Sequence, residues 1–394
     1  MGITFVINPG STSKTYAFYS GRECLYSVRY ERTEDGFACC RVKHNAPAVC
    51  ESVAPLIYQD ALADALTRAE AEGVAESPAA ITAVGVRVVA PGEPFAKHSK
   101  ITEEYLGDLA KQETVAPLHV PPILAEIKAA QAACPNATLY AVSDSAFHQS
   151  IPVHRRKIAF PASDTEDFDL KRFGYHGLSV GSIARRTEDF FGVAPDRVIV
   201  LHFGGGVSAT ALHYQESVDT SMGYSPSSGI LMSSRVGNCD ADALIALMTK
   251  KGLRDTKKLC AYLNEEAGFK GLTGYGDLRL VLDAFANDDP AAVEAMEMFR
   301  YQLQRQVGGH IALLGELDAF VFTGTAAVRN PFLRQFVLEG LSSFGLFLDT
   351  DRNDALVGHS GMIHSDRSDV SIGVMESDEM GEIARVVTRL SEDQ

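Results

Sequence analysis

The sequence predicts an α/β protein made of two lobes with a central cleft. Its 394 residues suffice for two or three domains. Strand and helix patterns alternate along the chain, and each half contains a strand–turn–strand unit whose turn is rich in Gly and Ser. We expect an N-terminal lobe over 1–150, closed by a C-terminal helix at about 378–394, and a C-terminal lobe over 151–377, with a ligand bound in the cleft.

The first lobe is expected to begin with a hairpin, in which strands 3–10 and 15–20 flank a polar turn. Two further strands, 24–32 and 37–44, extend the same sheet in this prediction. Helical periodicity predicts a helix over 57–73 that ends at Gly and another over 121–134 that begins with Pro. Buried strands are expected within 79–92 and from residue 137, the latter leading into a polar turn.

In the second lobe, a loop and then a helix are expected over 174–192, followed by a strand–turn–strand unit over 197–221. Helices are predicted at 240–252 and 290–317, and the segment 318–341 reads as strand, loop and helix. A strand and a closing helix follow within 369–390. The repeated strand–turn–strand unit allows two interpretations: a duplication, or two separate occurrences of a common unit.

Composition excludes several classes of protein. A formal net charge of -15 argues against sequence-independent binding of nucleic acid. The chain has no apolar run of about 18 residues and no signal-peptide pattern, so we expect no membrane span and a cytoplasmic location. Seven cysteines, an odd number without a CxxC pair, predict reduced thiols and neither a disulfide framework nor a zinc site.

Two turns have the composition of phosphate-binding turns, in which backbone N–H groups face an anion. The first, INPGSTSK at 7–14, is by itself also compatible with an ordinary polar hairpin turn. The second, HFGGGVSA at 202–209, places three glycines inside a strand pattern, which is most useful where backbone approaches a ligand closely. One such turn in each lobe predicts a protein that holds a chain of phosphates.

These turns and seven further motifs occur in the order known from one family. The motifs are GVRVVAPGE, APLHVPPIL, SDSAFHQSIP, KRFGYHGLS, DTSMGYSPSSGILMSSRVGNCD, GLTGYGDLR and FVFTG. The chain thus resembles acetate kinase and its short-chain acyl kinase relatives, which have the duplicated two-lobe fold of sugar kinases, Hsp70 and actin. The resemblance implies a reversible transfer of phosphate from ATP to a short-chain carboxylate, a need for Mg²⁺ or Mn²⁺, and a homodimer.

The resemblance also implies roles for individual residues. Formation of an acyl phosphate joins two anions, so its catalyst has to offset negative charge and align the reactants. The matching catalytic residues are Arg87, Asp144, His176 and Arg235. Metal-associated positions are Asn8, Asp144 and Glu379, an oxygen donor set of the kind that Mg²⁺ prefers.

The remaining matched positions concern binding. Those for the carboxylate are Val89, Leu118, His119, Tyr175, where the family usually has Phe, and Pro226. Those for nucleotide and phosphate are Ser11, Ser13, Lys14, His202, Gly204, Gly205, Gly206, Asp277, Arg279 and Thr325. His148, in the AFHQ motif, is expected to be structural.

The chain departs from the family mainly after FVFTG, where the family has a glycine-rich segment that approaches the nucleotide. Here that loop reads TAAVRN over 325–330, so Thr325 and Ala327 carry side chains in place of two glycines. In the second phosphate turn, Gly205 stands where the family has Asn. ATP is the favoured donor, because Asp277 and Arg279 are retained. Pyrophosphate or another donor, and a homologue that binds a ligand without catalysis, remain the alternatives.

Overall fold

The structure is a computed structural model and describes residues 2–10, 13–33, 36–44 and 46–392. Contacts divide the chain into unit 1, Met1–Ala146 with Asp378–Gln394, and unit 2, Phe147–Ser377. The lobe boundaries expected from the sequence, after residue 150 and at about residue 378, stay a prediction.

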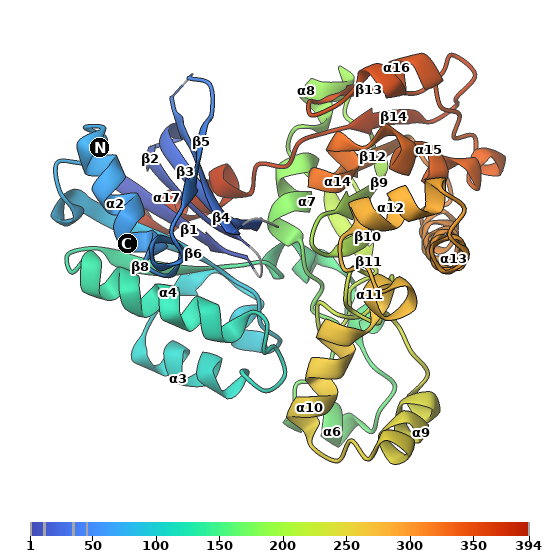
Figure 1. Ribbon diagram of the computed structural model, residues 1–394, viewed down its shortest axis with the longest axis horizontal. Helices are drawn as coiled ribbons and strands as arrows, with labels where there is room; N and C mark the ends of the chain where they lie inside the picture. The colour runs from blue at the N-terminus through green and yellow to red at the C-terminus, as the bar shows by residue number, and fades with distance from the viewer. Residues whose placement is uncertain (1, 11–12, 34–35, 45, 393–394) are drawn as a thin grey trace. The chain divides into compact units, whose positions relative to one another are not determined.

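Unit 1 is built on a sheet of eight strands in the order β5-β4-β3-β2-β1-β6-β8-β7 (Figure 1). The central strand β1 pairs antiparallel with β2, as the predicted hairpin requires, and parallel with β6. The strands are β1 Ile3–Pro9, β2 Ser13–Ser20, β3 Glu23–Thr33, β4 Gly36–Lys43, β5 Val49–Val53, β6 Ile81–Val88, β7 Ser99–Lys100 and β8 Thr138–Ser143.

Helices cover both faces of this sheet. A Cβ at Gly85 would lie 2.5 Å from Val387 and 2.8 Å from Ile383, so the absence of a side chain in β6 lets α17 (Glu379–Glu392) approach the backbone. On the other face, Tyr16 of β2 contacts Glu126 of α4 (Val120–Ala133). The remaining helices of unit 1 are α1 Pro55–Gln59, α2 Ala61–Ala71 and α3 Glu103–Lys111.

The sheet of unit 2 repeats the plan of the first. Its order is β11-β10-β9-β12-β14-β13, which corresponds to β3-β2-β1-β6-β8-β7, and each pair has the same parallel or antiparallel sense. This agreement supports duplication over a chance recurrence of strand–turn–strand units. The strands are β9 Arg197–Phe203, β10 Val207–His213, β11 Glu216–Thr220, β12 Ala319–Thr323, β13 Gly361–Met362 and β14 Ser371–Val374.

Helices of unit 2 again pack on both faces of the sheet. The cluster around Val180 and Ile183 of α7 (Gly177–Ala184) includes Val198 and Val200 of β9. On the other face, Phe203 of β9 packs edge-on against Phe299 of α13 (Pro290–Leu314). Further helices are α5 Val153–Arg156, α6 Ala162–Asp167, α8 Thr187–Phe191, α11 Gly268–Thr273, α12 Leu278–Ala286, α15 Pro331–Glu339 and α16 Thr350–Ala355.

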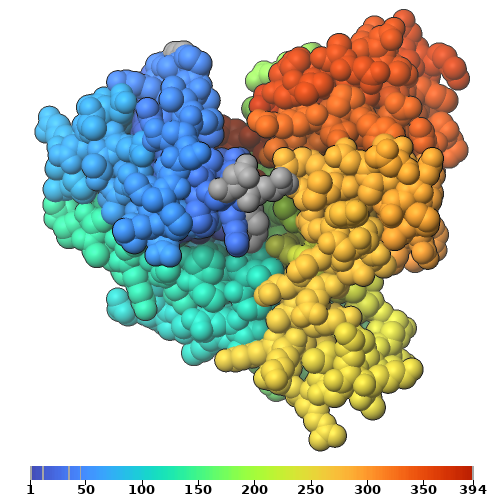
Figure 2. Space-filling view, in the orientation of Figure 1, coloured from blue at the N-terminus to red at the C-terminus, as the bar shows by residue number. Residues whose placement is uncertain are grey.

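Two helices of unit 2 contribute little to its core. Neither α9 (Ala241–Lys251) nor α10 (Thr256–Ala261) has a fully buried residue. Figure 2 shows the yellow segment that contains them at the surface of the unit. Both helices begin with an Asp whose side chain accepts hydrogen bonds from the first turn, Asp240 and Asp255, so local capping stabilises them where burial does not.

The prediction of a loop at 325–330 is wrong, because residues Thr325–Arg329 form a helical turn, α14. The cause is a tertiary contact from Arg334 of α15, whose side chain is completely buried. Its guanidinium donates to the backbone oxygens of Ala327 at 2.6 Å and Val328 at 3.2 Å, so carbonyl groups at the end of the turn are satisfied. Burial lowers the pKa of Arg334 to about 10.

The prediction that all thiols are reduced is also wrong. Cys40 and Cys50 form a disulfide between β4 and β5, where the strand register places them directly opposite each other. The spacing of ten residues in the sequence carries no sign of this register. The free cysteines among the described residues are Cys24, Cys39, Cys134, Cys239 and Cys260. None of the helices described is both long and apolar enough to cross a membrane.

Candidate active site

In unit 1, Arg87 and Asp144 lie at the ends of two neighbouring parallel strands. Arg87 is near the end of β6, and Asp144 directly follows β8. The Arg87 guanidinium donates two hydrogen bonds to the Asp144 carboxylate, from Nε at 3.2 Å and from Nη2 at 3.0 Å. Because Asp144 is completely buried, this forked pair fixes the plane of the guanidinium.

Asn8 and Glu379 complete this cluster. Nη1 of Arg87 donates to Asn8 Oδ1 at 3.2 Å and lies 3.4 Å from Glu379 Oε2. The Asn8 amide in turn donates to the same Glu379 oxygen at 3.0 Å. Residues from the first strand, the last helix and two inner strands thus meet around one guanidinium. The structure brings together all three positions predicted for a metal with one of the predicted catalytic arginines.

The pKa of Arg87 reflects this environment. Burial alone would lower the pKa of the guanidinium, but the carboxylates of Asp144 and Glu379 outweigh burial and raise it. Two carboxylates face one cation, so the cluster keeps a formal charge of about minus one. It can therefore accept further positive charge.

In unit 2, the second phosphate turn is surrounded by cationic and imidazole side chains. A Cβ at Gly206 would lie 3.0 Å from His176 Nε2 and 3.4 Å from Arg235 Nη1. A Cβ at Gly204 would lie 2.8 Å from His202 Nε2. The three side chains thus approach the backbone so closely that β-carbons would displace them, which explains glycine at 204 and 206.

Serine hydroxyls orient the two histidines. His176 Nδ1 lies 2.9 Å from Ser208 Oγ, and His202 Nδ1 lies 2.9 Å from Ser179 Oγ. The imidazole rings are stacked at a tilt, with centroids 4.2 Å apart. Both Nε2 atoms consequently lie beside the glycine turn. Sequence reasoning missed both serines, although Ser208 follows the glycines directly and Ser179 is three residues after His176.

Arg235 comes from a loop that also carries other predicted residues. It is 7% exposed, and its Nη1 donates to the backbone oxygen of Pro226 at 3.3 Å. Tyr175, which is completely buried, donates from its hydroxyl to the backbone oxygen of Tyr224 at 2.7 Å. A Phe at position 175, as in the family, would lack this bond. Two predicted residues of this loop, Arg235 and Pro226, are therefore in direct contact.

Lys14 is the predicted phosphate ligand whose surroundings agree least with its role. Its ammonium forms an ion pair with Glu126 at 3.0 Å and donates to the backbone oxygen of Gln59 at 3.3 Å. Glu126 is only 4% exposed and also accepts a hydrogen bond from Tyr16, so Lys14 offsets a buried carboxylate. Ser13 begins β2, and its backbone oxygen accepts from Gly10. Ser11 lies outside the described residues.

The other predicted binding residues occupy varied positions. Asp277 caps α12 and pairs with the exposed side chain of Arg279, which lowers the pKa of the Asp277 carboxyl. Thr325 is exposed at the start of α14, and a Cβ at Gly205 would contact nothing. In unit 1, Val89 is buried, while the half-buried Leu118 and His119 directly precede α4. His148 is completely buried, as a structural role requires.

Comparison with known proteins identifies the family. A model of the Acetokinase family matches residues 3–385. The chain belongs to the acetokinase family. It is 34% identical over 394 residues to acetate kinase of Clavibacter michiganensis subsp. michiganensis, and the match covers 98% of each chain.

Solved structures agree with this assignment. The crystal structure of Porphyromonas gingivalis acetate kinase has a TM-score of 0.81 at 28% identity, over 99% of this chain and all of that one. A propionate kinase from Francisella tularensis subsp. tularensis has a TM-score of 0.84 at 26% identity, with the same coverage. The prediction of a duplicated fold of the sugar kinase, Hsp70 and actin type is confirmed.

We predict that Arg87→Ala and Arg235→Ala each lower kcat at least a hundredfold. Each removes a largely enclosed cation from a reaction between two anions, and such a contact contributes roughly 3 kcal/mol or more. Steady-state kinetics of the purified variants checks this, with Arg254→Ala, an exposed position in unit 2, as the control. Near-normal turnover of either variant would remove that arginine from the mechanism.

Proposed function

We propose that this acetokinase family member transfers the γ-phosphoryl group of ATP reversibly to a short-chain carboxylate, which yields an acyl phosphate and ADP. A phosphotransferase with a carboxyl group as acceptor is the activity of the family to which the chain belongs. The observation that carries the proposal is the turn Gly204–Gly206, lined by His176 Nε2, His202 Nε2 and Arg235 Nη1.

The chemistry asks mainly for charge stabilisation. A carboxylate oxygen forms a bond to the γ-phosphorus while the bond from that phosphorus to the bridging oxygen of ADP breaks. The carboxylate is already ionised at neutral pH, so no proton has to leave the nucleophile. The enzyme instead has to stabilise the negative charge spread over the transferring group. Arg235 and the imidazole of His176 supply donors for that charge at the bare turn.

We propose the Arg87 cluster as the second part of the machinery. Arg87 offers a guanidinium for carboxylate or phosphoryl oxygens, and Asp144 holds that guanidinium in one plane. This positions Arg87 for a substrate anion before the anion binds. Asp144 therefore has a role in orienting the arginine in addition to any role with a metal.

The same cluster fits a divalent cation. Asn8, Asp144 and Glu379 offer only oxygen donors, and Mg²⁺ is usually held by one or two carboxylates with water and phosphate oxygens. Nowhere among the described residues do three His, Cys, Asp or Glu side chains form a metal site, which agrees with so small a protein contribution. Bound Mg²⁺ or Mn²⁺ would offset charge on the phosphates. We name Asn8, Asp144 and Glu379 as the residues that hold it.

For the acid we propose Val89, Leu118, His119, Tyr175 and Pro226. In support, the backbone oxygen of Pro226 accepts a hydrogen bond from Arg235. The hydroxyl of Tyr175 donates to the backbone oxygen of Tyr224, which is two residues before Pro226. Val89 follows Arg87 by two residues and is buried. Val89 and Tyr175 are buried, and buried apolar surface suits a short alkyl group.

For the donor we favour ATP over pyrophosphate. Of the two residues that replace family glycines, Ala327 is completely buried, so its methyl group packs in the core of unit 2. The side chain of Arg329 is exposed to solvent, so we expect it not to occupy the position of a nucleotide phosphate. Thr325 is the one replacement whose side chain is exposed. We assign Ser11, Ser13, Lys14, His202, Asp277, Arg279 and Thr325 to the phosphates and nucleotide.

We also propose a homodimer in the cytoplasm, with no nucleic-acid or membrane partner. The net charge of -15 supports the absence of a nucleic-acid partner, and the free cysteines support the location. The Cys40–Cys50 disulfide argues against the location, because disulfides are rare in the cytosol.

The proposed function is tested by trapping acyl phosphate with hydroxylamine. Acetate, propionate and butyrate are each supplied with ATP or with pyrophosphate, with Mg²⁺ and with EDTA. We expect acyl hydroxamate from at least one acid with ATP, and loss of the product in EDTA. Product from pyrophosphate alone would overturn the ATP assignment, and no product from any pair would favour a homologue without catalysis.

We predict that Thr325→Gly lowers the KM for ATP, whereas the matched variant Ala327→Gly leaves it unchanged. The first variant removes an exposed side chain at the position where the family approaches the nucleotide, and the second removes a methyl group from the core. Calorimetry with ATP, ADP and pyrophosphate measures the same difference directly. Equal ATP affinity of both variants would show that position 325 does not control the donor.

A further inference from the structure

We propose that His148 is a positioning residue for His176, and that it acts through the peptide bond between Tyr175 and His176. This inference rests on the proposed role of His176 at the phosphate turn. His148 does not belong to either cluster described above. Its importance follows from an unusual backbone conformation at His176.

His176 has a left-handed backbone, with φ of 62° and ψ of 19°. This conformation costs a residue with a β-carbon about 1–2 kcal/mol. His176 also directly precedes α7, and its backbone oxygen accepts the bond from Val180 at 2.9 Å. The conformation turns the chain into the helix, while the side chain reaches Ser208 and the glycine turn. Neighbouring contacts have to hold it.

His148 contacts the peptide group that directly precedes the Cα of His176. Its Nε2 lies 2.9 Å from the backbone oxygen of Tyr175, and its Nδ1 lies 2.8 Å from Ser217 Oγ. A carbonyl oxygen only accepts, so Nε2 carries the proton. The imidazole is completely buried and neutral when Nδ1 accepts from the Ser217 hydroxyl. The two ring nitrogens therefore contact two different residues, Ser217 and Tyr175.

The geometry of the peptide group links this bond to His176. The oxygen of Tyr175 and the nitrogen of His176 belong to one planar peptide unit. The torsion φ of His176 is the rotation about its N–Cα bond, and it sets how the imidazole is turned relative to that plane. A hydrogen bond that holds the plane therefore restrains the direction in which the imidazole of His176 projects at a given φ.

The imidazole of His148 also packs on the backbone just before this bond. A Cβ at Gly174 would lie 2.7 Å from Cδ2 of His148, and Gly174 itself has a φ of 75°. The amides of Phe173 and Gly174 donate to the backbone oxygen of Gly223. Gly174 and His176 thus both have a positive φ, and the buried ring of His148 contacts the backbone at Gly174 and the peptide group before His176.

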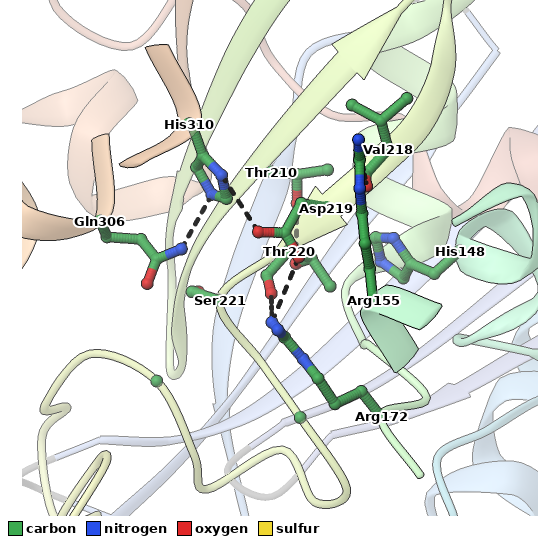
Figure 3. Close-up of polar contacts among 12 residues, drawn as sticks. His148, Arg155, Arg172, Thr210, Val218, Asp219, Thr220, Ser221, Gln306 and His310 are labelled. Carbon is green, nitrogen blue, oxygen red and sulfur yellow. Dashed lines mark hydrogen bonds and ion pairs between the residues drawn. The ribbon is translucent and has the colours of Figure 1, made fainter. Parts of the chain in front are cut away.

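His148 is itself anchored to a rigid strand. Its partner Ser217 lies in β11, the edge strand of the sheet, and residues that follow His148 fasten the outer side of this strand. Ser150 donates to the backbone oxygen of Ser217 at 2.8 Å. Arg155 donates to the backbone oxygen of Val218 at 3.1 Å, and Arg172 donates to that of Thr220 (Figure 3). These bonds satisfy carbonyls that an edge strand would otherwise expose.

Two substitutions separate the two bonds of His148. The amide of Gln reaches about as far as Nε2, and that of Asn about as far as Nδ1. His148→Gln therefore keeps a donor for the oxygen of Tyr175, whereas His148→Asn keeps only a partner for Ser217. We expect His148→Asn to lower kcat about tenfold or more with little change in KM, and His148→Gln to stay within about threefold of the wild type. Ser217→Ala is the control for the other bond and should also keep its kcat.

A readout that does not depend on activity accompanies the kinetics. In protein labelled with ¹⁵N-histidine, we expect the His176 ring signals, assigned by their loss in His176→Ala, to shift in His148→Asn and not in His148→Gln. Thermal unfolding of the two His148 variants should be similar, because each loses one buried hydrogen bond. In the background of His176→Ala, His148→Asn should have no further effect on kcat.

Equal kcat values for His148→Gln and His148→Asn, together with unshifted His176 signals, would overturn the inference. If His176→Ala itself keeps full activity, the proposed role of His176 fails instead. The ring signals of His176 then still decide whether His148 holds the peptide plane. A full loss of kcat from His148→Asn in the His176→Ala background would show that His148 acts on something else.

Discussion

The close approach of three side chains to the glycine turn between β9 and β10 is the constraint on which unit 2 depends. His176 and Arg235 lie against Gly206, and His202 lies against Gly204. The start of α7, which carries His176, the strand β9, which carries His202, and the loop that carries Arg235 must therefore be positioned to within a fraction of an ångström of this turn. The serines that orient the histidines and the strained backbone of His176 are consequences of this demand. The result is a concentration of hydrogen-bond donors beside bare backbone, as binding of a phosphoryl group requires.

The duplicated frame is used differently in the two units. In unit 1, the ends of β6 and β8 present Arg87 and Asp144. In unit 2, at the ends of the corresponding strands β12 and β14, the hydroxyl of Thr323 donates to the backbone oxygen of Met375 at 2.6 Å. The turn between the first two strands of each unit also differs. In unit 2 an imidazole, His202, precedes the three glycines, whereas in unit 1 an amide, Asn8, precedes the turn. In the function that we propose, each unit thus contributes a different part of the chemistry on the same plan.

Much of the fold and many site positions could be predicted from sequence, because strand and helix periodicity is local and the motifs are specific in combination. The strands around both turns and the helix that ends before Gly252 follow from such signals, whereas the single helix predicted over 57–73 is divided at Asp60 into α1 and α2. What failed depends on contacts between distant residues. The helical turn at Thr325–Arg329 depends on Arg334, and the Cys40–Cys50 bond depends on strand register. The ion pair of Lys14 with Glu126 joins residues 112 positions apart, and the hydrogen bond of His148 to Tyr175 joins residues 27 positions apart. Neither contact leaves a local pattern in the sequence.

The most direct measurement of the central claim compares Gly206→Ala with Gly205→Ala. Neither glycine has a φ in the left-handed region, so alanine is compatible with the backbone at both positions. At 206 the new methyl group would lie 3.0 Å from His176 Nε2, whereas at 205 it would contact nothing. With acetate, propionate or butyrate as acceptor and ATP as donor, our account predicts a loss of kcat of tenfold or more for Gly206→Ala and nearly unchanged turnover for Gly205→Ala. Equal turnover of the two variants would contradict the claim that this turn holds the transferring phosphoryl group.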